Sequence, residues 1–100
     1  MSVTVTTDVA QGRARAVIDG QQAGRLGFRI SETEGSPVWT LYTTVVDPDF
    51  EGRGVGSALV RDVIEHADAA GAIVHPTCWF VAGWLDRHPQ YQHLLPDDMR

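Results

Sequence analysis

The sequence has a single cysteine, Cys78, no lysine, and no apolar run that approaches the length of a membrane span. One cysteine excludes an intramolecular disulfide and therefore a disulfide-stapled secreted scaffold, so the reducing cytoplasm is the expected location. A membrane-spanning helix needs about 20 consecutive apolar residues, and a secretion signal needs a basic start before an apolar stretch. The sequence has neither pattern, and we expect no association with a membrane.

Positive charge is also scarce. The 8 basic residues are all arginine and are scattered along the sequence, against 13 acidic residues, so the formal net charge is -5. Binding to nucleic acid needs clustered basic residues, and we therefore expect no nucleic-acid partner. A cationic acceptor such as an amine would be weakly attracted by the overall field.

The 100 residues show no linker, repeat or low-complexity segment, and 43% of them are apolar. This balance predicts one globular domain over residues 1–100. An exposed strand edge can pair with a second copy, so we expect a monomer or a weak homodimer.

The first half of the sequence predicts four β-strands. β-Branched or alternating apolar residues mark four segments: 3–7, 13–18, 23–30 and 38–46. The period of two is typical of strands with one buried face. Turn residues separate the segments, notably Asp19-Gly20 and the stretch 34–37. Because the connections are short, an antiparallel meander is expected.

The second half changes to a helical period after Pro48, which lacks the N–H that a strand interior needs. Apolar residues fall on one stripe from 54 to 70, and Gly71 follows as a C-terminal cap. A short strand over 72–75 and a short helix over 81–88 complete the pattern. The predicted fold class is α/β with a mixed sheet, in which an antiparallel meander is followed by a βαβ unit and a short C-terminal helix.

A glycine-rich loop over 51–56, Glu-Gly-Arg-Gly-Val-Gly, lies between the last meander strand and the long helix. Glycines allow positive φ and close approach of a ligand to the backbone, and a helix N-terminus attracts anions. Arg53 adds a fixed positive charge. A diphosphate is the expected ligand, while a helix start that binds nothing is the alternative.

Two familiar phosphate motifs fit this loop poorly. A Walker-type loop requires lysine, which is absent. A dinucleotide-binding fingerprint requires Gly or Ala where Leu59 stands. The acetyltransferase motif consists of Arg or Gln, any two residues, Gly, any one residue, and then Gly or Ala. Gly54 and Gly56 match this motif, but Glu51 stands where the motif has Arg or Gln.

The stretch 47–60 resembles the central motif of the GNAT acetyltransferases. Pro76-Thr77-Cys78-Trp79-Phe80-Val81 and Arg87-His88-Pro89-Gln90-Tyr91 narrow the resemblance to the short, single-domain GNAT-related N-acetyltransferases. The resemblance is specific over about the last 60 residues and covers the meander only in outline. It implies a GNAT-like mixed sheet and acetyl-CoA as the acyl donor, with a small-molecule or protein amine as the acceptor. Glu51 opposes a diphosphate, and Thr43-Thr44-Val45 replaces a His-Thr-Glu segment that is frequent in the short family.

The resemblance also implies a set of site residues. The pyrophosphate of CoA would lie on Gly52, Arg53, Gly54, Val55, Gly56 and Ser57. The backbone of Val45 and Val46 would pair with the pantetheine arm where the fourth and fifth strands part, and His88 would reach CoA or shape a turn.

Two residues are candidates for catalysis. Cys78 lies near the start of the short final helix, with Thr77 as the expected cap, and a helix N-terminus favours the thiolate. It would act as nucleophile toward the acyl group or as acid toward the leaving thiol, and a buried core residue is the alternative. Tyr91 matches the family position of the acid that protonates the CoA thiolate, and the alternative is a ring that closes the core edge.

The remaining polar and aromatic residues carry weaker signals. The four histidines, His66, His75, His88 and His93, show no metal-ligand spacing, so no metal is expected. His75 is a candidate helper for amine deprotonation, and a structural hydrogen bond is its alternative. The large aromatics are expected in the core or lining a groove: Trp39, Trp79, Phe80 and Trp84.

Three functions follow from these observations. The first is an N-acetyltransferase that acts on an amine. The second is a module that binds CoA or acyl-CoA with little catalysis, and the third is an interaction protein that keeps the fold without CoA. The sequence does not identify the acceptor.

Overall fold

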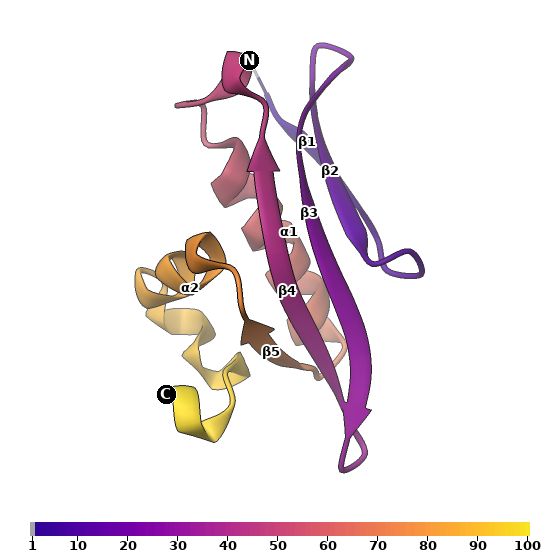
Figure 1. Cartoon of the computed structure of the whole chain (residues 1–100), viewed down its shortest axis with the longest axis vertical. Coiled ribbons are helices and arrows are strands. Elements are labelled where there is room, and N and C mark those ends of the chain that lie inside the picture. Colours follow the sequence, from indigo (N-terminus) through magenta and orange to yellow (C-terminus); the bar gives the residue numbers. More distant parts are fainter. Residues whose placement is uncertain (1) are drawn as a thin grey trace.

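The computed structural model describes residues 2–100, which form a five-stranded sheet in the order β1-β2-β3-β4-β5 (Figure 1). The strands are β1 (Thr4–Asp8), β2 (Arg13–Ile18), β3 (Gln21–Thr33), β4 (Ser36–Val46) and β5 (Ile73–Pro76). The first four pair antiparallel in chain order, and β5 pairs parallel to β4. The fold class predicted from the sequence is confirmed.

Two tight hairpins set the lengths of the long central strands. Asp19 and Gly20 both have positive φ, 49° and 79°, as do Glu34 and Gly35 at 54° and 82°. Paired positive φ values are typical of the two-residue turn whose twist matches that of the flanking strands. β3 and β4 therefore reach the turns directly, and the expected turn over 34–37 was two residues too long.

The helices follow the predicted order. They are α1 (Val55–Ala69) and α2 (Trp79–Asp86), with 3-10 turns η1 (Pro48–Phe50), η2 (Pro89–Leu94) and η3 (Asp97–Met99). α2 begins two residues earlier than expected, and its N-cap is Cys78 rather than Thr77. Within residues 2–100, no helix is both long and apolar enough to cross a membrane.

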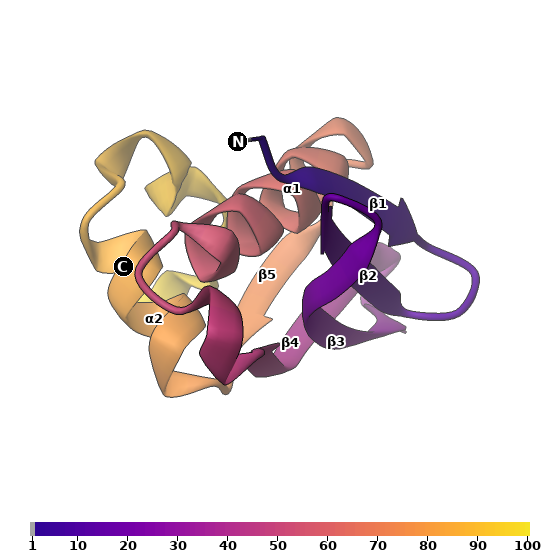
Figure 2. The same ribbon diagram turned by 90° about the horizontal axis from the view of Figure 1, so that it is seen from above.

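The core lies on one side of the sheet only. α1 packs its apolar stripe on this side, and Figure 2 shows no helix over the opposite side of the described chain. Alternate residues of β2 illustrate the division, since Ala14, Ala16 and Ile18 are buried while Arg13 and Arg15 are exposed. We call the uncovered side the open face of the sheet.

A bulge in β4 shifts the alternation near its middle. Phe28 pairs with Leu41 and Gly27 pairs with Thr43, so Tyr42 is the extra residue. After the bulge, Thr44 lies across from buried Leu26 on the covered side, while Thr43 lies across from Gly27 on the open face. The bulge thus decides which side chains of β4 point toward each side.

Candidate active site

The glycine loop and the first turn of α1 line a cavity of about 230 Å³. The wall is completed by one residue from the end of β4, one from η1 and one from α2. The full lining is Val46, Phe50, Glu51, Gly52, Gly54, Val55, Gly56, Ser57 and Phe80. The loop predicted to bind a diphosphate therefore faces a cavity bounded by three separate parts of the chain.

The N-terminus of α1 offers free backbone donors to this cavity. The first intrahelical bond runs from the N–H of Ala58 to the carbonyl of Gly54, at 3.0 Å. The N–H groups of Val55, Gly56 and Ser57 precede it, and Gly54 has no side chain to cap them. Together with the helix dipole, these donors attract an anion.

The glycines of the loop serve two different purposes. Gly52 and Gly54 have φ of 80° and 76°, and a Cβ at either position would meet nothing within 4 Å. They are needed for the conformation of the loop. A Cβ on Gly56 would instead lie 2.7 Å from Cζ of Phe80. Gly56 is therefore needed so that α2 can pack closely against the start of α1.

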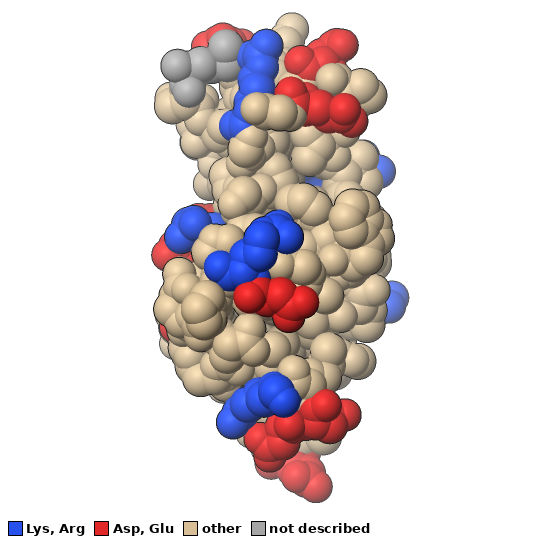
Figure 3. All heavy atoms as spheres, turned by 90° about the vertical axis from the view of Figure 1, so that its left-hand side faces the viewer, with Lys and Arg blue, Asp and Glu red and all other residues tan. Residues whose placement is uncertain are grey.

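Charges near the cavity are mixed. Glu51 lines the cavity and is exposed, so its carboxylate opposes a bound phosphate. The Arg53 guanidinium lies over the Phe50 ring, 5.4 Å from its centre. The carboxylate of Asp47 accepts a hydrogen bond from the N–H of Asp49 at 2.9 Å and so caps η1. Figure 3 views the molecule from the left-hand side of Figure 1 and shows blue and red side chains next to one another at the top, middle and bottom, with uncharged surface between these groups.

β4 loses its β5 partner halfway along its length. The parallel pairing ends at Leu41 and Pro76. The carbonyl of Leu41 accepts the N–H groups of Thr77 and Cys78, at 3.1 and 3.2 Å, and the chain then turns into α2. Within the described chain, residues 42–46 pair only with β3. The edge of β4 that includes Val45 and Val46 is consequently available to a ligand.

Cys78 lies where the strands part. Its Sγ is 3.8 Å from Oγ1 of Thr44 on β4, and the residue is buried with 9% of its surface exposed. Burial raises the pKa of the Cys78 thiol, but hydrogen bonds from the backbone of Val81 and from the Thr44 hydroxyl lower it, and the net pKa is below its ordinary value. Cys78 is thus both a core residue and a thiol with increased thiolate character.

Two predicted residues lie elsewhere. The Tyr91 hydroxyl donates a hydrogen bond to Glu65 on α1 at 3.3 Å. The ring of His88 stacks on Trp84 with centroids 3.7 Å apart, and its Nδ1 lies 2.6 Å from the carbonyl oxygen of Trp84. Neither Tyr91 nor His88 lines the cavity at the loop, so their predicted roles toward CoA remain predictions.

The tryptophans divide between core and surface. Trp39 and Trp84 are buried, and the indole Nε1 of Trp84 donates to the Ser57 hydroxyl at 2.8 Å, which joins α2 to the first turn of α1. Trp79 is 83% exposed, so it is not a core residue, and the expectation that it lines a groove stays a prediction. It is the first residue of α2, and its side chain points away from the helix packing that buries Trp84.

His75 lies on the open face, since it is exposed and pairs with Thr40 of β4. No group of three or more metal-ligating side chains occurs among residues 2–100. Sequence reasoning did not identify Thr44 as the partner of Cys78. No local signal could have done so, because the two residues are 34 positions apart.

Residues 13–94 match the family model described as GCN5-related N-acetyl-transferase. The mycothiol acetyltransferase of Propionibacterium freudenreichii subsp. shermanii is 39% identical over 62 residues, which are 58% of this chain and 20% of that protein. The chain spans about a fifth of the length of the curated relatives it matches.

Solved structures share the fold at lower identity. An aminoglycoside acetyltransferase from an uncultured soil metagenomic sample, in complex with sisomicin, is 19% identical with a TM-score of 0.62. The match covers 80% of this chain and 55% of that one. Arabidopsis thaliana Naa50, in complex with the bisubstrate analogue CoA-Ac-MVNAL, is 19% identical with a TM-score of 0.59, over 66% of this chain and 45% of that one.

Proposed function

The chain belongs to the GCN5-related N-acetyl-transferase family, and on this premise we propose that it transfers an acetyl group from acetyl-CoA to an amine. The observation that carries the proposal is that residues 44–46 of β4 connect three features. These are the free donors at the start of α1, which share a cavity with Val46, the free edge of β4 itself, and the Cys78 thiol, which contacts Thr44. An acyl-CoA has a diphosphate, an extended amide arm and a thioester in the same order.

The residues at the loop fit a diphosphate. The N–H groups of Val55, Gly56 and Ser57 have no capping side chain, and open space surrounds Gly52 and Gly54. Such a helix start binds phosphate through backbone donors. The amide arm of the donor would pair with the main chain of Val45 and Val46, because this edge has no strand partner within residues 2–100.

Cys78 is the residue that we assign to the chemistry. A lowered pKa increases the thiolate fraction, which suits a nucleophile better than an acid. The thiolate attacks the acetyl carbonyl, a new C–S bond forms, and CoA leaves as its thiolate. A neutral amine then attacks the acetyl-cysteine, the amide C–N bond forms, the Cys78 thiolate leaves, and the amine proton passes to solvent.

Binding of acetyl-CoA, measured by calorimetry, tests the first part of the proposal. We expect Gly54→Asp to abolish binding, because the new side chain strains a positive φ and places a carboxylate beside the phosphate donors. Gly35→Asp is the matched control, since Gly35 also has positive φ and open surroundings but lies in the β3–β4 turn. Absence of binding to the wild-type protein would contradict the proposal.

Mass spectrometry after mixing with acetyl-CoA tests the second part. The wild-type protein should gain one acetyl group on Cys78, and Cys78→Ser should bind acetyl-CoA without gaining the group or acetylating amines. Full activity in Cys78→Ser would show that acetyl transfer does not require the cysteine. Binding without any turnover would instead favour a CoA-binding module, which is supported by Thr43-Thr44-Val45 in place of the more polar His-Thr-Glu segment.

A further inference from the structure

Four arginines gather on the open face of the sheet, although they are dispersed in the sequence. Arg13 and Arg15 come from β2, and Arg25 and Arg29 come from β3. All four are exposed and represent half of the 8 basic residues of a chain whose net charge is -5. The folded chain therefore creates a local positive surface that the overall charge conceals.

The arrangement of these arginines costs stability. Arg15 and Arg25 are direct cross-strand partners, and like charges in that position repel each other. Within residues 2–100, none of the four forms an ion pair with a carboxylate. Asp8 stands across from Arg13, but no carboxylate stands across from Arg15 or Arg25. A like-charge pair of this kind is expected at functional or strained sites, so these positive charges point to an external anion.

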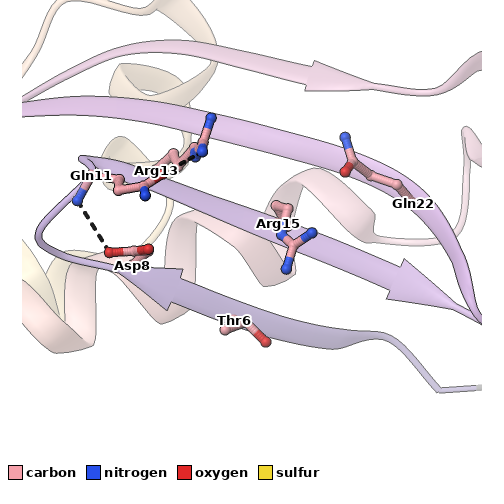
Figure 4. A pocket seen from close by; sticks show the side chains of 6 residues that line it. All are labelled: Thr6, Asp8, Gln11, Arg13, Arg15 and Gln22. Carbon is pink, nitrogen blue, oxygen red and sulfur yellow. Dashed lines mark hydrogen bonds between the residues drawn. The ribbon is translucent and has the colours of Figure 1, made fainter.

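Two adjoining cavities lie among these side chains. The larger, about 450 Å³, is lined by Thr6, Asp8, Gln11, Arg13, Arg15 and Gln22 (Figure 4). The second, about 260 Å³, is lined by Gln11, Gly12, Arg13, Arg25, Leu26, Gly27, Tyr42 and Thr43. They share Gln11 and Arg13, and we call the two together the arginine groove.

Hydrogen bonds hold the polar wall of the groove in place. Figure 4 shows Arg13 and Arg15 side by side on β2, with Gln11 and Asp8 at the turn that precedes them. Arg13 donates to the side-chain oxygen of Gln11, and the backbone N–H of Gln11 donates to Asp8 at 3.1 Å. The one carboxylate of the groove is thus engaged by a backbone donor, while Arg15 is directed into the cavity.

The groove leads to the free edge of β4. Thr43, Gly27 and Arg13 are successive cross-strand partners in one row across the sheet. Two strand spacings separate Thr43 from Arg13, which is about 10 Å. Tyr42 closes one side of this path, because its ring lies against Gly27 and under the Arg29 guanidinium at 4.7 Å. Thr44, the residue after Thr43, points to the covered side and contacts Cys78 there, so the groove and the thiol lie on opposite sides of the sheet and meet only at the edge of β4.

We propose that the arginine groove binds the acyl acceptor, and that this acceptor is an amine that carries a carboxylate or phosphate group about 10 Å from its reacting nitrogen. The amine lies at the edge of β4, and the anionic group is held by Arg13 and Arg15, with Arg25 adding to the field. The proposal rests on the proposed acetyl transfer and adds to it the charge and length of the acceptor.

The size and charge of the groove favour a small anion over a polyanion. Guanidinium groups bind carboxylate and phosphate with paired donors. Apart from the four arginines of the open face, the chain has only four basic residues against 13 acidic ones. An extended polyanion would meet this excess of acidic residues beyond the groove, whereas a single anionic group would not.

A matched set of amines tests the proposal. The wild-type protein is assayed with acetyl-CoA and hexylamine, ε-aminocaproate, aminohexyl phosphate or hexane diamine, which share one chain length and differ in the charge of the far end. We expect kcat/KM for the two anionic amines to exceed that for hexylamine by about tenfold, the usual effect of one charged hydrogen bond. Equal values, or a preference for the diamine, would overturn the proposal.

Variants then test whether the arginine groove causes the preference for anionic amines. In the double variant Arg13→Gln with Arg15→Gln, the anionic amines should lose their advantage while hexylamine turnover and acetyl-CoA binding remain unchanged. Arg100→Gln removes one positive charge outside the groove and should leave the preference intact. An advantage that persists in the double variant would contradict the role of the groove. Both side chains are exposed, so the fold should survive the changes.

Direct binding of an anion distinguishes failure of the proposed acetyl transfer from failure of the proposed anion site in the groove. If no amine is acetylated, the proposed function fails, and titration with inorganic phosphate followed by NMR still tests the groove. If phosphate changes the chemical shifts of the Arg13, Arg15 and Gln22 amides, and these changes are absent in the double variant, the anion site is supported even without acetyl transfer. No shift in the wild-type protein would overturn it.

Discussion

The thiol of Cys78 and the hydroxyl of Thr44 face each other where β4 and β5 part, with Sγ 3.8 Å from Oγ1. The hydroxyl stabilises the thiolate against the effect of burial. Together with the backbone of Val81, a strand residue thereby lowers the pKa of a residue at the start of α2. The way β4 and β5 part therefore affects the reactivity of Cys78, the only cysteine of the chain.

Thr44→Val should raise the pKa of Cys78, because the substitution keeps the volume and removes the hydroxyl that favours the thiolate. The measurement is the rate of thiol alkylation as a function of pH, whose midpoint should move to higher pH. Thr43→Val is the control, since Thr43 lies on the open face. An unchanged midpoint would show that backbone donors alone set the pKa.

The stability of the protein should depend on pH through Cys78. Its folded pKa lies below the ordinary thiol value, so the unfolded chain binds more protons between the two values. The free energy of unfolding should therefore rise with pH across that window, up to the ordinary value of about 8.5. Urea denaturation of Cys78→Ser should lack this rise, and a parallel rise in both proteins would refute its assignment to Cys78.

Gly56→Ala should destabilise the fold although alanine favours helices. The new Cβ would lie 2.7 Å from Cζ of Phe80, so the ring or α2 must move. Overpacking of this kind costs about 1–3 kcal/mol, measured by denaturant unfolding. Adding Phe80→Leu should restore much of the loss. If Gly56→Ala is stabilising by itself, the packing of α2 on α1 is looser than the structure indicates.

Ser57→Ala should cost about 1–3 kcal/mol, because the indole N–H of buried Trp84 loses its acceptor. A double-mutant cycle with Trp84→Phe isolates the hydrogen bond from the loss of indole volume. We expect a coupling energy of about 1 kcal/mol. Additive effects in the cycle would mean that the bond does not link the two helices in solution.

Tyr91→Phe should leave acetyl transfer nearly unchanged. The hydroxyl is directed to Glu65 on the outer side of α1, and the ring keeps its stacking on Trp84 at 5.6 Å. An exposed hydrogen bond of this kind contributes little to stability. The assay compares kcat and KM for acetyl-CoA in the two proteins. A loss of kcat with unchanged KM would instead support the role of Tyr91 as the acid toward the leaving thiol.

The sequence alone determined the order of elements and the position of the loop. Strand and helix periods are local, so residues a few positions apart revealed the meander, α1 and β5. The glycines of the loop predicted the helix start for the same reason, since positive φ at Gly52 and Gly54 is a local property. Binding of an anion there stays a prediction. The family resemblance rested on these contiguous motifs and is confirmed.

Only the tertiary structure decided which distant residues meet. The packing of Phe80 on Gly56 depends on how α2 lies against α1. The contact of Cys78 with Thr44 and the row of Thr43, Gly27 and Arg13 depend on strand register and on the bulge at Tyr42. A shift of one residue in register would move each side chain to the other side of the sheet. Arginines that are scattered in the sequence become a groove because pairing between strands brings them to the face that α1 leaves uncovered.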